Sequence, residues 1–151
     1  MNRFDKEVHD FSEIESILRE GEMLYISLPV EDMLYTVPLQ FGYAAGLLYI
    51  CGTPQKRKPL ILEQNDTVRF TCLSSFQMER GERPCEWSMS YSCVTGNGTA
   101  RKVDEYEEKL NALRCIMKHG SKFRTMEFPM LHRTLIYCIH IAEITGKKSS
   151  W

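Results

Sequence analysis

The sequence predicts a mainly β domain, a small antiparallel barrel with helices packed at its margins. Segments with strand-like alternation recur along most of the chain, and short turn segments join many of them. Helical periodicity is confined to a segment near the N-terminus, a short one in the middle and a longer one in the last third. Strands joined by hairpins are typical of small barrels, whereas a doubly wound fold needs regular strand–helix alternation.

Length and composition indicate one globular domain spanning residues 1–151. Hydrophobic residues make up 43% and charged residues 26%, and the net charge of −1 gives no general attraction to nucleic acid or anionic membranes. No apolar run reaches the length of a membrane span, and the N-terminus lacks the apolar segment of a signal peptide. We therefore expect a cytoplasmic protein with neither a nucleic acid nor a membrane as partner.

The first half of the chain predicts one helix and three strands. Asp10, with Glu13 three residues later, is typical of a helix start with a capping box, and Gly21 of a helix stop. Apolar alternation then predicts strands at 24–28, 34–39 and 47–51, separated by turns at 29–32 and 41–46.

Pro38 lies inside the second of these strands and has no backbone N–H to donate to a ladder. It therefore marks an edge strand, a bulge or a place where something other than a strand lies alongside, such as a flat ligand. The residue alone does not separate these alternatives.

The segment 47–58 places a buried strand before a turn at Cys51–Pro54 and the three cations Lys56, Arg57 and Lys58. A short helix is predicted at 59–64. Backbone N–H groups at such a turn and helix start, with cations beside them, are one way to build a phosphate site. The alternative is a solvated basic turn.

The second half predicts a strand at 67–73, a long loop at 74–85 and the longest strand at 87–101. Gly96 and Gly98 interrupt that strand and indicate a bulge or a bend. The remaining elements are a helix from Asp104 to Gly120, an irregular segment at 121–134, a strand at 135–144 and a short cationic tail at 145–151.

The cysteines and histidines show no metal-binding pattern. The six cysteines stand singly, without a C-x-x-C pair, which favours small buried side chains, and the four histidines lack ligand spacing. No Ser/His/Asp grouping, G-x-x-x-x-G-K-[ST] loop or obvious general acid or base is present. We predict no metal site, and the sequence leaves the catalytic residues unknown.

Several motifs in order along residues 1–149 resemble the Nim-like, nitroimidazole-resistance-like branch of the FMN-binding split barrels, which are related to pyridoxamine 5′-phosphate oxidase. The matching residues are Tyr35-x-Val37-Pro38-Leu39-x-Phe41-Gly42-Tyr43, Leu48-Tyr49 with Gly52 and Lys58, Cys85-x-Trp87-x-Met89-x-Tyr91, Val94 with Gly96, Gly98 and Ala100, the helix Glu105–Met117, and Ile144-Thr145-Gly146-Lys147.

The resemblance implies a six-stranded antiparallel split barrel, a homodimer and FMN at the subunit interface. The phosphate would lie at the turn Cys51–Lys58, and the isoalloxazine along the strand of Pro38, near the Thr36 hydroxyl and the Val37 and Leu39 amides. Trp87 is either a packing residue or a stacking partner of the ring, and Lys147 belongs to a solvated tail or contacts the phosphate or the partner subunit. The expected cofactor-binding residues are Thr36, Val37, Pro38, Leu39, Cys51, Gly52, Thr53, Lys56, Arg57, Lys58, Trp87, Cys93 and Lys147.

Three positions depart from the family pattern. Cys51 stands where the family often has His, Lys56 where it often has Gly, and Cys93 where it commonly has Ser. The first hypothesis is an FMN-dependent oxidoreductase acting on a small electron-poor acceptor, with nitroaromatics as one class. The alternatives are a non-catalytic flavin-binding or flavin-sensing protein, and a haem-binding relative, which the loss of the His disfavours although a Cys thiolate can also ligate haem.

Overall fold

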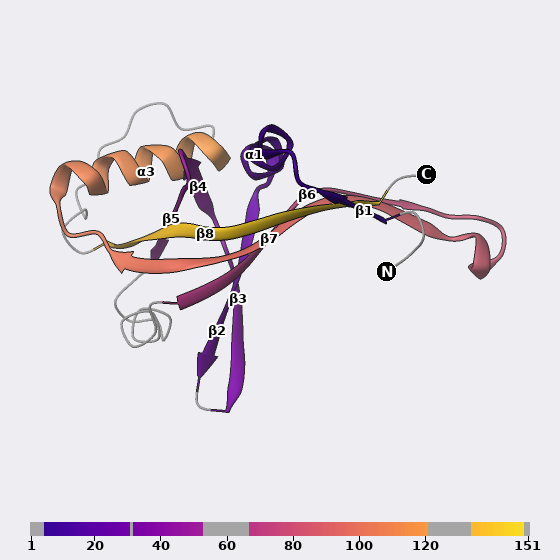
Figure 1. Ribbon diagram of the computed structural model, residues 1–151, viewed down its shortest axis with the longest axis horizontal. Coiled ribbons are helices and arrows are strands. Elements are labelled where there is room, and N and C mark those ends of the chain that lie inside the picture. The colour runs from indigo at the N-terminus through magenta and orange to yellow at the C-terminus, as the bar shows by residue number, and fades with distance from the viewer. Residues whose placement is uncertain (1–4, 31, 53–66, 121–133, 150–151) are drawn as a thin grey trace.

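The computed structural model describes residues 5–30, 32–52, 67–120 and 134–149 (Figure 1). One antiparallel sheet of eight strands dominates it, with strand order β3-β2-β6-β7-β8-β5-β4 and β1 paired to β8. The elements are β1 Asp5–Val8, α1 Phe11–Glu20, β2 Met23–Val30, β3 Met33–Leu39, β4 Phe41–Ala44, β5 Leu47–Gly52, β6 Thr67–Glu79, the 3-10 helix η1 Pro84–Glu86, β7 Ser88–Lys102, α3 Tyr106–Gly120 and β8 Leu135–Ser149.

The mainly β fold with flanking helices is confirmed. The two ends of the strand order, β3 and β4, are joined by the single residue Gln40, so the sheet must curl until its edges approach each other. Eight strands replace the expected six because the short strands β1 and β4 are added. Residues 41–44, predicted as part of a turn, form β4, and the turn itself is Ala45-Gly46, where both residues have positive φ (46° and 82°). That conformation is typical of a two-residue hairpin loop.

Alternation along the strands separates a packed inner face from an outer face. Leu24, Ile26 and Leu28 of β2 are buried, and they join the main core with side chains from the other strands and from α1. On the outer face, α3 covers β4 and β5, and a second apolar cluster forms there around Tyr49, Ile136 and Cys138. Gly42 permits this approach, because a Cβ there would lie 2.6 Å from backbone atoms of Cys115 and Ile116.

Helix α1 begins and ends where the sequence predicts, but for different reasons. Asp10 is the N-cap residue without a side-chain capping bond, and Glu13 instead pairs with Lys148 of β8. Gly21 is extended (φ −67°) and not left-handed. A Cβ at Gly21 would overlap the Cys72 sulfur, so the glycine is required by close packing of the helix end on β6.

The structure corrects three further predictions of where a strand or helix begins or ends. Residues 74–79, expected in a loop, extend β6, and Thr145–Ser149, expected in a tail, extend β8, which pairs there with β7 and β1. Helix α3 begins at Tyr106 and not at Asp104. The predicted helix at 59–64 and, apart from Thr134, the predicted irregular segment at 121–134 lie outside the described residues.

Candidate functional site: an uncovered outer face

Part of the outer face of the barrel carries apolar side chains that neither described helix covers. Helix α3 packs on β4 and β5, and α1 packs on the core, whereas Met23 and Tyr25 of β2 and Leu73 of β6 point outward and are 38–43% exposed. In register with Tyr25 lie Pro38 on β3 and Thr71 on β6. The result is a flat, largely apolar wall beside the strand that contains Pro38.

The same face continues along a two-stranded arm formed by the ends of β6 and β7, which leads away from the barrel (Figure 1). A register shift at Ser74 changes the phase of β6, so that Phe76 and Met78 face the same way as Leu73. Opposite them in the ladder lie Tyr91 and Met89.

The arm is therefore amphipathic. Phe76, Met78 and Met89 are 55%, 43% and 44% exposed on one side. The pairs on the other side are all polar: Ser75 with Ser92, Gln77 with Ser90, and Glu79 with Ser88. We call the outward side chains of Met23, Tyr25, Leu73, Phe76, Met78 and Met89 the open face.

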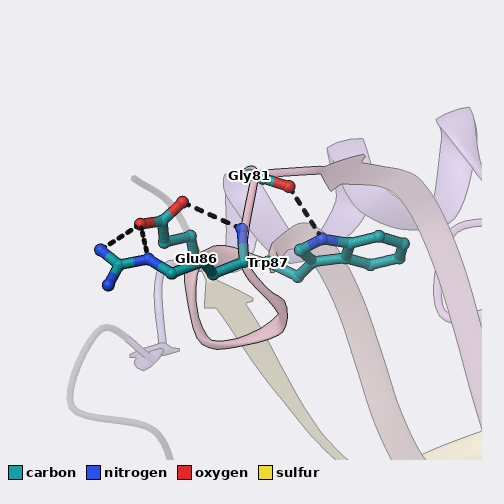
Figure 2. A network of polar contacts seen from close by, with 4 residues as sticks. Gly81, Glu86 and Trp87 are labelled. Atoms are coloured by element: carbon teal, nitrogen blue, oxygen red, sulfur yellow. Dashed lines mark hydrogen bonds and ion pairs between the residues drawn. The ribbon is translucent and has the colours of Figure 1, made fainter.

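The tip of the arm holds Trp87 in a fixed orientation (Figure 2). Its indole Nε1 donates a hydrogen bond to the Gly81 carbonyl at 3.0 Å, and the Arg80 guanidinium lies 5.2 Å from the ring centroid. Beside it, Arg83 contacts the Glu86 carboxylate through Nε at 2.9 Å and through its backbone N–H at 3.2 Å. These hydrogen bonds lower the pKa of Glu86. Trp87 nevertheless remains 48% exposed.

The residues expected around the flavin ring and the start of the phosphate turn lie close together. Phe41 of β4 is opposite Ile50 of β5, so the end of β3 approaches the end of β5, where Cys51 and Gly52 lie. On β3, Thr36 and Pro38 point outward and are exposed, whereas Val37 and Leu39 are half-buried against the core. The Cys51 side chain packs with the cluster under α3. Thr53, Lys56, Arg57 and Lys58 lie outside the described residues.

Cys93 and Lys147 form a second group. They are directly opposite each other in the β7–β8 ladder, and Cys93 shares the outward face with Tyr91 and Met89. Lys147 is thus part of a strand, flanked by Cys93 on one side and by Glu7 of β1 on the other.

Trp87 lies far from Gly52 of the same chain. Gly52 is opposite Leu135 at the start of β8, and Tyr91 is opposite Ser149 at its end. Leu135 and Ser149 are fourteen residues apart, which corresponds to a path of about 45 Å along β8 at roughly 3.3 Å per residue. Trp87 is four residues further along the arm. One small cofactor does not touch both residues of a single chain.

A small apolar pocket lies elsewhere, beside α1. Its volume is about 180 Å³, and Phe11, Ile14, Tyr43 and Ile144 are among the side chains that line it. The Tyr43 hydroxyl is already used, donating to Glu15 at 2.8 Å. None of the expected cofactor-binding residues lines this pocket, so we do not place a phosphorylated ligand there.

Comparison with known proteins decides the family. Residues 10–148 match the family model described as pyridoxamine 5′-phosphate oxidase. The chain belongs to this family. The resemblance seen in the sequence is therefore confirmed.

Three solved structures show the same fold as this member of the pyridoxamine 5′-phosphate oxidase family. A proposed 5-nitroimidazole antibiotic resistance protein from Bacteroides thetaiotaomicron is 25% identical, with a TM-score of 0.82 over 95% of this chain and 87% of the other. A FAD-binding protein from Mesorhizobium loti is 15% identical, with a TM-score of 0.72 over 97% of this chain and 99% of the other. A FAD- and haem-binding protein from Mycobacterium smegmatis is 16% identical, with a TM-score of 0.81 over 97% of this chain and 74% of the other. No curated protein sequence matches the chain.

Across the described residues, no three His, Cys, Asp or Glu side chains are grouped so that they could hold a metal ion. No helix in the same part of the chain has the length and apolar character needed to cross a membrane.

The open face was not predicted from the sequence. The only signal was that Met23 and Tyr25 are large apolar residues on the outward side of a predicted strand. On the arm, the alternation of Phe76 and Met78 was obscured by the surrounding polar residues, which favoured a loop.

The six cysteines differ in reactivity in a way that modification can test. Burial raises the pKa of the Cys72 thiol to about 12 and also raises that of Cys138, whereas Cys85 is exposed at the arm tip. Because the thiolate is the reactive species, iodoacetamide at pH 8 should modify Cys85 first and leave Cys72 and Cys138 unmodified until the protein unfolds. Peptide mass spectrometry with and without urea measures this order. Early modification of Cys72 in native protein would contradict the packing of β6 under α1.

Proposed function

We propose that the chain is a homodimeric, FMN-dependent oxidoreductase that reduces a small electron-poor acceptor, with nitroaromatic compounds as a candidate class. The observation that carries the proposal is the exposed strand β3, whose Pro38 lies beside Tyr25 on an apolar wall that neither described helix covers, and close to the end of β5. Family membership and the flavin-binding relatives support it.

The residues present fit a flavin. Among the described strands β3 pairs only with β2, so one side of its backbone is available to a ligand. In an edge strand the nitrogen of a proline faces the free side, and successive amides alternate in direction. We therefore infer that the Thr36 amide also faces the free side and that the Val37 and Leu39 amides face β2. This revises the expected ring contact from the Val37 and Leu39 amides to the Thr36 amide.

The two ends of the cofactor would have different surroundings. Pro38 and Tyr25 offer flat apolar surface to the ring, while Gly52 begins the segment that leads to Lys56, Arg57 and Lys58. Backbone N–H groups and cations are the donors that a phosphate requires. When bound, the flavin supplies the redox chemistry, and the protein supplies binding, orientation and exclusion of water.

The visible spectrum of the purified protein, loaded with FMN if it is isolated without cofactor, tests the proposal. We expect the two absorption bands of a flavin, bleaching by NADPH or NADH, and reoxidation that a nitroaromatic acceptor accelerates beyond the rate with oxygen. Reduction without acceptor-dependent reoxidation would indicate the non-catalytic flavin-binding alternative. A Soret band would indicate a haem-binding protein, and failure to bind any flavin would refute the proposal.

A further inference from the structure

A row of polar side chains crosses five strands on the outer face of the barrel, beside the ladder pair of Pro38 and Tyr25. From β3 through β2, β6 and β7 to β8, the members of this polar row lie directly opposite one another: Thr36, Ser27, Arg69, Asn97 and Glu143. The neighbours of Arg69 along β6, Val68 and Phe70, are buried in the core, so the Arg69 side chain points outward. The polar row thus brings one cation to the middle of the face that holds the proposed flavin site.

The charge of Arg69 is left unpaired by its neighbours. The Ser27 and Thr36 hydroxyls are hydrogen-bonded to each other at 3.0 Å, and the Asn97 amide donates to the Glu143 carboxylate at 3.4 Å. Within the part of the chain that the structure describes, the Arg69 guanidinium forms neither an ion pair nor a hydrogen bond. Its planar set of N–H donors therefore remains available to a ligand.

The other arginine in the described strands shows the contrast. Arg101 of β7 also points outward, but its guanidinium is ion-paired with Glu108 of α3 and donates from Nε to His140 at 3.1 Å. The ladder neighbours of Arg69 are instead Ser27 and Asn97, neither of which carries a charge. Arg69 thus differs from a cation that holds one element of the fold against another.

Arg69 is placed to reach a molecule that lies over the apolar wall. Tyr25 is opposite Thr71 of β6, and Arg69 is two residues before Thr71, so Arg69 and Tyr25 are diagonal neighbours on the same face. Diagonal neighbours in an antiparallel pair are about 7–8 Å apart, a separation within reach of a long side chain. Pro38 follows one strand further, opposite Tyr25. A planar substrate resting over Tyr25 and Pro38 would therefore present its edge to the Arg69 guanidinium.

We propose that Arg69 binds a carboxylate of the acceptor, so that the preferred substrates are electron-poor aromatic carboxylates. This inference rests on the function proposed above and names the substrate class of that site. A guanidinium binds a carboxylate through two parallel hydrogen bonds, which fix the orientation of the bound group as well as its position. The contact therefore holds the aromatic ring across the wall on which the flavin ring is proposed to lie.

Charge balance around Arg69 favours a carboxylate over a phosphate. A phosphate monoester is close to dianionic at neutral pH and is bound by several cations or backbone N–H groups. The polar row supplies one guanidinium, and its carboxylate, Glu143, belongs to β8, two strands and about 10 Å from β6. Arg69 therefore matches a single negative charge, and Glu143 would repel a second one.

Two acceptors of similar shape and different charge test the contact in the FMN-loaded protein. We expect the ratio of kcat/KM for 4-nitrobenzoate to that for neutral 4-nitrobenzamide to fall about tenfold in Arg69→Gln, because a charge-assisted contact is lost. The loss should appear mainly in KM, since the contact is made equally to substrate and transition state, and Arg69→Lys should restore part of it. Lys102→Gln, which removes an exposed cation at the end of β7, is the matched control and should leave the ratio unchanged.

An unchanged ratio in Arg69→Gln would overturn the proposal. A wild-type preference for 4-nitrophenyl phosphate over 4-nitrobenzoate would overturn the choice of a carboxylate.

Benzoate gives a readout that does not depend on turnover. Isothermal titration calorimetry should show benzoate binding about tenfold more weakly to Arg69→Gln than to the wild-type protein, with the affinity for benzamide unaffected. Circular dichroism shows whether the variant is folded. Equal benzoate affinity of the two proteins, or no benzoate binding by the wild type, would overturn the contact. Failure of the wild-type protein to bind FMN would refute the proposed function instead, and the benzoate comparison would still decide whether Arg69 binds carboxylates.

Discussion

Replacing Gly98 with alanine should lower the free energy of unfolding by about 2–3 kcal/mol. A Cβ at this position would overlap the His140 carbonyl oxygen and would lie 2.9 Å from Cγ2 of Ile139. Both atoms belong to β8, which pairs with β7 from Tyr91 to Lys102, so the backbone has little room to move away. The change also falls at the register shift between Asn97 and Gly98, where the ladder is already interrupted.

Asn97→Ala is the matched control, one residue away in the same strand. The Asn97 side chain makes a long contact, 3.4 Å, from Nδ2 to the Glu143 carboxylate, and we expect its loss to cost about 0.5 kcal/mol or less. Urea unfolding of both variants, followed by circular dichroism, gives the two free energies. Equal stability of Gly98→Ala and Asn97→Ala would show that β7 and β8 do not approach each other as closely as described.

The fold could be predicted because most of its determinants are local. Alternation identified every long strand at least in part, and Gly96 and Gly98 indicated an irregularity where the β7–β8 ladder does shift. An edge strand was one of the three alternatives that Pro38 left open, and β3 does lie at one end of the strand order. These features depend on residues within a few positions of one another.

The strand extensions and the contact that were not predicted depend on segments far apart in the sequence. Residues 74–79 are rich in serine and extend β6 only because they pair with Ser88–Ser92, and Thr145–Ser149 extend β8 between β7 and β1. Gly21 looked like a left-handed helix stop, but its role is to make room for Cys72, fifty-one residues later. The pattern of residue types within a few positions of the chain does not encode such contacts.

The candidate site was predictable in composition but not in arrangement. Residues 36–39 and Cys51–Gly52 were expected together and lie close together, because Phe41 pairs with Ile50. Trp87 was expected either to pack or to stack on the ring, but the arm carries it to the other end of the sheet from Gly52. Its direction follows from the bulge at Ser74, which no single motif in the sequence marks.

The largest expected effect on ligand binding is that of Lys58→Ala, which should weaken FMN binding by about tenfold or more. A charge-assisted contact to phosphate contributes roughly 1.5–3 kcal/mol, and 1.4 kcal/mol corresponds to a factor of ten. Lys58 lies outside the described residues, so this expectation rests on its position six residues after Gly52, with Lys56 and Arg57 beside it.

Riboflavin separates a phosphate contact from a general loss of the site, because it has the same ring and side chain as FMN without the phosphate. If Lys58 binds the phosphate, Lys58→Ala should reduce the affinity for FMN and leave that for riboflavin unchanged, and Lys58→Arg should retain much of the FMN affinity. Lys6→Ala, which removes an exposed cation from β1, controls for the change in net charge. Flavin fluorescence titrations measure all of these affinities. A parallel loss for FMN and riboflavin would mean that Lys58 supports the structure of the site, and unchanged FMN affinity would place the phosphate elsewhere.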